Sequence, residues 1–113
     1  MIEQDRIRIE HILESIADIE QFIGSMTRED FIWNKLVRSA VVRQFEIIGE
    51  AAGSITENLQ NQYPEIPWRI IKGFRNVLIH HYFGVDYNEV YTVYESNLPE
   101  LKNQILSILN DRD

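Results

Sequence analysis

The sequence contains no cysteine, and no run of apolar residues in it is longer than three. Without cysteine the chain can form neither a disulfide nor a thiolate nucleophile, and a reducing cytoplasm is its expected location. A membrane-spanning helix requires about 20 predominantly apolar residues in succession, so we expect no membrane partner. The sequence therefore favours a cytoplasmic protein without thiol chemistry.

Positive charge is also scarce, since 11 Lys and Arg stand against 18 Asp and Glu and give a net charge of −7. This balance argues against strong nonspecific binding of nucleic acid. The distribution is uneven, because residues 1–27 and 76–113 each contain two bases and six acids, whereas residues 28–75 contain seven bases and six acids. A local phosphate-binding patch in the middle of the chain is therefore compatible with the composition.

The chain contains many apolar residues at helical spacing. They recur every three or four positions, and no strand-like alternation persists, which predicts an all-α fold. At 113 residues the chain has the size of one domain, and we expect residues 1–113 to form a single helical domain with its own core. The expected architecture is an up-and-down bundle of four to five helices.

The first expected helix covers about residues 2–24. The second begins after Thr27, which together with Asp30 resembles a capping box, and the apolar spacing continues it for roughly thirty residues. Gly49 and Gly53 lie inside this long helix, and each costs about 1 kcal/mol relative to alanine. Close packing of another helix at these two glycines is the expected compensation.

A loop at residues 60–67 precedes the third helix, which we expect to run from near Trp68 to residues 82–84. Asp86 is expected to begin a fourth helix, and Pro99 to interrupt the pattern before a last helical piece. The third helix is expected to bury five apolar residues: Ile70, Ile71, Phe74, Val77 and Leu78.

Residues 75–82, Arg-Asn-Val-Leu-Ile-His-His-Tyr, carry the strongest functional signal. Their pattern R-x4-H-x-Y combines a permanent cation (Arg75), a proton carrier near neutral pH (His80) and a phenol (Tyr82). A histidine can take the proton from a ribose 2′-hydroxyl or give one to the leaving 5′-oxygen, and an arginine can stabilise charge on the phosphate oxygens. The set suits RNA cleavage without a metal or another cofactor. Asn76 is expected to hold the phosphate or orient Arg75, and Tyr82 to bind the phosphate or set the tautomer of His80.

The spacing of these residues matters for how a site is assembled. A regular helix turns by about 100° per residue, so Arg75 and Tyr82 project from nearly the same side, whereas His80 lies about 140° away from Arg75. One straight helix cannot bring all three to one point. Either the helix unwinds near His80, or a second copy of the chain completes the site, and the geometry favours a composite site in a twofold dimer.

Other interpretations of the same residues stay open. Arg75 could simply form a salt bridge with Glu46 or Glu50 of the long helix. The neighbouring His80 and His81 could hold a metal ion, but adjacent helical residues point about 100° apart. No Asp or Glu lies three or four positions before them, so we expect no metal site.

Two segments, residues 41–52 and residues 68–86 with the R-x4-H-x-Y motif, closely resemble the HepT-like branch of the HEPN superfamily. The resemblance covers essentially the whole chain. It implies a HEPN-like helical domain that forms a homodimer, with the motif in the cleft between the subunits. It also implies a metal-independent endoribonuclease that is the toxin of a type II-like or type VII toxin–antitoxin module.

By the same resemblance, Arg75 and His80 are the catalytic residues and Asn76 supports them. Tyr82 is then the acceptor of AMP groups that a cognate minimal nucleotidyltransferase antitoxin transfers to silence the toxin. A different function also stays open, in which the chain is a non-catalytic helical binding subunit of a nucleotidyltransferase. In that case Arg75 and Tyr82 would bind the partner or a nucleotide, and His80 would be structural.

Overall fold

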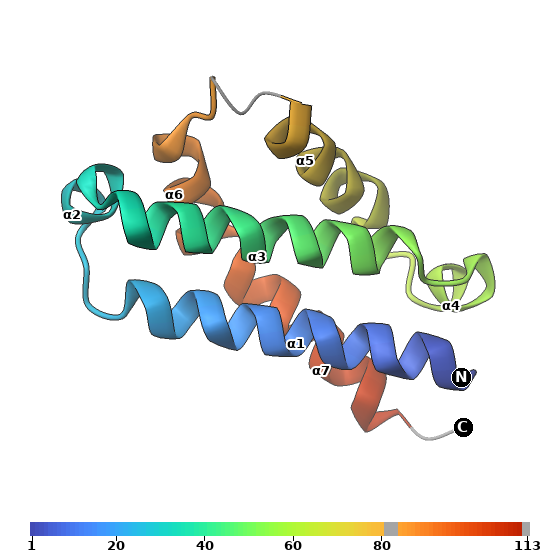
Figure 1. Ribbon diagram of the computed structural model, residues 1–113. Coiled ribbons are helices and arrows are strands. Elements are labelled where there is room, and N and C mark those ends of the chain that lie inside the picture. Colours follow the sequence, from blue (N-terminus) through green and yellow to red (C-terminus); the bar gives the residue numbers. More distant parts are fainter. Residues whose placement is uncertain (81–83, 112–113) are drawn as a thin grey trace.

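The computed structural model describes residues 1–80 and 84–111, without the side chain of His80, and all regular structure in these residues is helical. Figure 1 shows α1 and α3 side by side and antiparallel, with α5 and α6 on the side of α3 away from α1. The all-α prediction is therefore confirmed. No helix in the described part of the chain is both long and apolar enough to cross a membrane. The helices are α1 (Glu3–Ile23), α2 (Arg28–Trp33), α3 (Lys35–Gly53), α4 (Glu57–Gln62), α5 (Trp68–His80), α6 (Tyr87–Ser96) and α7 (Leu98–Asn110).

The core forms around the isoleucine stripe of α1, which packs against α3 and α7. Isoleucines three and four positions apart share one face of a helix, so the whole stripe leaves water together. The buried members from these three helices include Ile9, Ile12, Ile16, Ile19, Val41, Phe45, Ile48, Ile105 and Ile108.

The expected second helix of about thirty residues is wrong, because this stretch forms three helices, α2, α3 and α4. Asn34 has extended backbone angles, and its side chain accepts a hydrogen bond from the Val37 N–H at 3.0 Å. Thr56 likewise caps α4 by accepting from the Leu59 N–H at 3.3 Å. These caps satisfy N–H groups that a helix start leaves unpaired. The described residues therefore contain seven helices rather than four to five.

Two expected helix starts are confirmed. Thr27 Oγ1 accepts from the Asp30 N–H at 3.1 Å and begins α2. The Asp86 carboxylate accepts from the N–H groups of the next helix at 3.0 and 3.2 Å and begins α6. Side-chain caps of this kind depend on residues close in sequence, which is why sequence can locate them.

The buried side of α5 differs from the expected one. Leu78 is buried, and Phe74 packs edge-on against Phe45 with ring centroids 5.5 Å apart, but Ile70 is 73% exposed and Val77 52% exposed. Helix α5 packs along α3, and residues seven apart such as Ile70 and Val77 fall together on the side that α3 does not cover. The expectation that these two residues are buried within the chain is therefore wrong.

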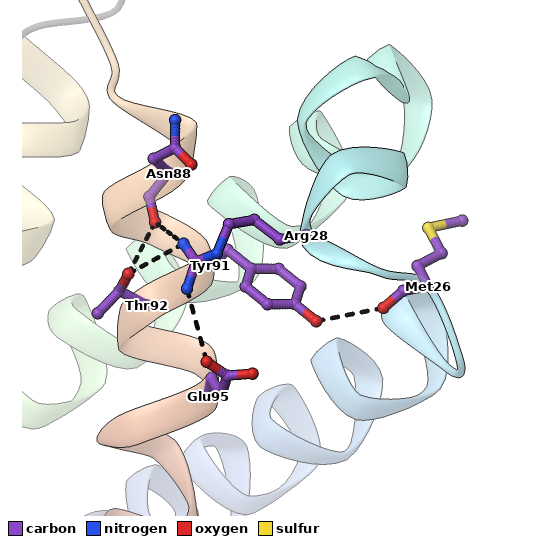
Figure 2. A network of polar contacts seen from close by, with 6 residues as sticks. All are labelled: Met26, Arg28, Asn88, Tyr91, Thr92 and Glu95. Carbon is purple, nitrogen blue, oxygen red and sulfur yellow. Dashed lines mark hydrogen bonds and ion pairs between the residues drawn. The ribbon is translucent and has the colours of Figure 1, made fainter.

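A polar network joins α2 to α6 and so places the chain that follows the motif. Figure 2 shows Arg28 reaching from α2 to α6, where its Nη1 donates to the Asn88 carbonyl oxygen at 2.9 Å and to Thr92 Oγ1 at 3.0 Å. Its guanidinium also lies over the ring of Tyr91, 4.8 Å from the centroid, and the Tyr91 hydroxyl donates to the Met26 carbonyl. One arginine thus fixes the N-terminal half of α6 against α2.

A buried carboxylate joins the start of α1 to the junction between α3 and α4. Asp5 is 1% exposed, and it accepts hydrogen bonds from the Thr56 N–H at 3.0 Å and from Thr56 Oγ1 at 2.6 Å. Buried polar groups cost free energy unless they are paired, and these two bonds pair both partners. The contact closes the end of the bundle where α1 begins and α3 ends.

We expect Asp5→Ala to lower the free energy of unfolding by about 2–3 kcal/mol, because it leaves the Thr56 N–H and hydroxyl without their acceptor. Urea denaturation followed by circular dichroism measures this loss. Glu10→Ala, an exposed acid on the same helix, is the matched control and should change stability by less than about 0.5 kcal/mol. An Asp5→Ala variant as stable as the control would contradict the structural role of the contact.

Candidate functional site

The motif residues lie at and beyond the C-terminal end of α5. Arg75 and Asn76 are in its last two turns, and His80 is its last residue. Tyr82, with the neighbouring His81, lies outside the described residues, as does the expected extension of the helix to residues 82–84. The structure therefore brings Arg75 and Asn76 together and places His80 by its backbone alone.

The stem of Arg75 packs directly on α3. A methyl group at Gly49 would lie 2.1 Å from Arg75 Cβ and 2.9 Å from its Cγ, which no real structure tolerates. One turn further along, a methyl group at Gly53 would lie 3.1 Å from Lys72 Cδ. The expectation that close helix packing compensates the two glycines is confirmed, and the helix that packs there is the one that carries the motif.

The guanidinium of Arg75 is held by one neutral contact. Its Nη1 donates to Asn76 Oδ1 at 3.2 Å, and its Nε is buried without a hydrogen-bond partner. Among the described residues it forms no ion pair. Glu46 instead pairs with Arg43 at 3.5 Å, so the salt bridge from Arg75 to Glu46 or Glu50 is absent. A cation without an acidic partner keeps its charge available for an anionic ligand.

The charged side chains of α5 are all positive. The helix contains Arg69, Lys72 and Arg75 and no acidic residue. None of the three cations forms an ion pair within the part of the chain that the structure describes. Successive members are three residues apart, so each lies about 60° round the helix from the one before, and the three span about a third of its circumference. Three of the seven bases in residues 28–75 therefore lie on this one helix.

The side of α5 that faces away from α3 forms an apolar face that the chain leaves open. We call it the open face, and it consists of Ile70, Gly73 and Val77. A methyl group placed on Gly73 would meet no atom within 4 Å. His80 follows Val77 by three residues and Gly73 by seven, so it occupies the same helical register. The sequence analysis did not identify Gly73. Its only signal there is its position on the helix face between Ile70, three residues before it, and Val77, four residues after it.

Within residues 1–80 and 84–111, leaving aside the His80 side chain, no three His, Asp or Glu side chains gather in a way that would hold a metal ion. His81, the other histidine of the motif, is not among these residues.

Comparison with known proteins shows which family this chain belongs to. Residues 12–108 match the family model described as ribonuclease HepT-like, and no solved structure matches the chain. A Thermococcus cleftensis protein named as a probable ribonuclease HepT is 41% identical over 85% of this chain and 87% of its own length. A Methanocaldococcus jannaschii protein, provisionally named a ribonuclease, is 43% identical over 88% of this chain and 83% of its own.

A longer M. jannaschii protein is 39% identical over 96% of this chain, and its name joins gamma-glutamylcyclotransferase to a provisional ribonuclease. This chain spans 49% of the length of that protein. The matched region of the family model contains α3, α5 and the motif between residues 75 and 82. The chain belongs to the HepT-like ribonuclease family.

Proposed function

We propose that this chain is an endoribonuclease that cleaves RNA without a metal, with Arg75 and His80 as its catalytic residues. The observation that carries the proposal is the state of Arg75. Its stem is fixed against Gly49, its guanidinium has no acidic partner among the described residues, and its helix contains cations but no acid. A phosphate is the ligand that such an arginine suits best.

In the proposed reaction the ribose 2′-oxygen attacks the adjacent phosphorus and the bond from phosphorus to the 5′-oxygen breaks. One His80 imidazole takes the 2′-hydroxyl proton, and an imidazolium gives a proton to the leaving 5′-oxygen. The Arg75 guanidinium donates to the equatorial phosphate oxygens, where charge increases in the transition state. Asn76 accepts from Nη1 alone, and Nε is buried, so the remaining N–H groups of Nη1 and Nη2 are the donors proposed for the phosphate.

A homodimer supplies what one chain lacks. Acid and base act together, and a single chain has one His80, about 140° round α5 from Arg75. The open face offers a place for the second copy, because Ile70 and Val77 are exposed and Gly73 lets another helix backbone approach closely. A twofold axis near this face would bring two His80 residues together, since the histidine shares its register.

Purified protein should cleave a defined RNA in the presence of a chelator, and His80→Ala should lower the cleavage rate by about 100-fold or more, the size of a lost general acid–base group. His11→Ala, an exposed histidine on α1, is the matched control and should cleave like the wild type. The measurement is the initial rate of product formation on a gel. Equal rates for His80→Ala and wild type would overturn the catalytic assignment, and an inactive wild type would favour the binding-subunit alternative.

Gly73→Leu should weaken the dimer by about tenfold or more, because a leucine side chain would keep the second helix at a distance. The single chain should still fold, since the position has free space and leucine favours a helix by about 0.8 kcal/mol over glycine. Sedimentation velocity across a dilution series measures the dimer, and circular dichroism checks the fold. Ala17→Leu on the exposed side of α1 is the control. An unchanged dimer in Gly73→Leu would exclude the open face as the contact.

We further propose that the chain is the toxin of a toxin–antitoxin pair and that its nucleotidyltransferase antitoxin modifies Tyr82. The tyrosine oxygen attacks the α-phosphorus of ATP, AMP is transferred to it, and pyrophosphate leaves. The support is sequence position, since Tyr82 follows His80 by two residues. The added phosphodiester would bring bulk and negative charge to the segment that follows Arg75 and His80, where it would compete with RNA.

Co-expression with a cognate nucleotidyltransferase should therefore add one or more AMP groups to the chain, and Tyr82→Phe should abolish the addition. Tyr87→Phe, a nearby tyrosine at the start of α6, is the control and should be modified like the wild type. Intact mass and peptide mapping measure the outcome. Full modification of Tyr82→Phe would place the acceptor elsewhere.

A further inference from the structure

A groove of about 320 Å³ lies between α5 on one side and α6 and α7 on the other. Its apolar lining comes from α3, α5, α6 and α7, so the groove lies where these four helices meet. The side of α5 that borders it carries neither Arg69, Lys72 nor Arg75. Ile70 of the open face also lines the groove, so the groove adjoins the proposed dimer contact but contains no cation of α5. Its apolar lining includes Phe45, Ile48, Ile71, Phe74, Val93 and Leu101.

Three glutamates border this apolar groove. Glu65 lies in the loop before α5, Glu89 in the first turn of α6 and Glu100 in the first turn of α7. None of them forms an ion pair within residues 1–80 and 84–111, and no Lys or Arg of those residues lines the groove. Glu89 and Glu100 also interact favourably with the positive ends of their helices. No Lys or Arg of the described residues lies at the groove to compensate their negative charge.

We propose that this groove is a docking site for a basic amphipathic helix of a partner protein. Apolar side chains supplied by flanking helices are the surface onto which an amphipathic helix lays its apolar face. The described residues contain no strand and so offer no sheet edge for an extended peptide. The occupant needs Lys or Arg beside its apolar stripe, because complementary charge determines which partners are accepted.

The distribution of the glutamates favours a helix over other occupants. They come from three segments, and Figure 1 shows the loop before α5 and the start of α6 at opposite ends of the space between these helices. A small ligand with a single positive charge would leave the charge of two of the three carboxylates unbalanced. A second copy of this chain would bring a net charge of −7 to an acidic border, and its proposed place is the open face, which contains no acidic residue. RNA is repelled by the same acidic border.

The test uses the full chain and a fluorescein-labelled synthetic peptide about four helical turns long, with leucine on one face and lysine on the other. Fluorescence anisotropy should show micromolar binding, and Glu89→Lys/Glu100→Lys should weaken it by about tenfold. The control double variant is Glu3→Lys/Glu57→Lys. It changes net charge equally and also replaces glutamates in the first turns of helices, away from the groove. Its affinity should stay within about twofold of the wild type.

Several outcomes would overturn the proposal. Equal weakening in both double variants would show attraction by net charge alone. Equal binding of a peptide with glutamate in place of lysine would remove the charge match, and displacement of the peptide by phenylpropylamine at a similar concentration would indicate a small-ligand site. Loss of the dimer in Glu89→Lys/Glu100→Lys would make the groove a subunit contact. No RNA enters this assay, so its result is independent of the proposed cleavage.

Discussion

The position of the cationic helix depends on one close contact, between Gly49 of α3 and the stem of Arg75 of α5. A methyl group at Gly49 would overlap the arginine at 2.1 Å, and the contact of Gly53 with Lys72 extends the same seam by one turn. Protein interiors are packed too densely to absorb such an overlap without moving the backbone. The two glycines therefore determine how near α5 approaches α3, and this approach orients every other side of α5.

Three different chemistries surround α5 once it is fixed in this way. The cations follow one side, the open face of Ile70, Gly73 and Val77 occupies another, and Ile70 and Phe74 border the acidic groove. A helix packed on all sides could not display them, because burial would require each charge to be paired. Contact with α3 alone along most of its length is what leaves these surfaces available. The proposed recognition surfaces thus lie on a helix whose main packing partner is a single helix, α3.

The elements that sequence could predict are those determined by neighbouring residues. The isoleucine spacing of α1 and the caps at Thr27 and Asp86 are local signals, and all three appear in the structure. The breaks at Asn34 and Thr56 were missed, because apolar spacing continues on both sides of each cap and spacing alone does not register a turn.

The candidate site could be predicted only in part for a related reason. Two glycines four residues apart indicated close packing, but nothing in the sequence identified α5 as the helix that approaches them. Periodicity likewise showed that Ile70 and Val77 share a stripe without showing what covers it. An apolar stripe has the same pattern whether it faces its own core or another molecule, so their exposure had to come from the structure.

Segregated charge would allow a chain with a net charge of −7 to bind the polyanionic substrate proposed for it. At physiological ionic strength the field of a charge decays over about 8 Å, so the charges nearest a phosphate decide whether it binds. Arg69, Lys72 and Arg75 lie on a helix without acids, and the proposed dimer would bring two such helices to one cleft. The acids elsewhere would lower nonspecific affinity for nucleic acid. RNA would then be held only where α5 contacts it, which is also where Arg75 is proposed to act.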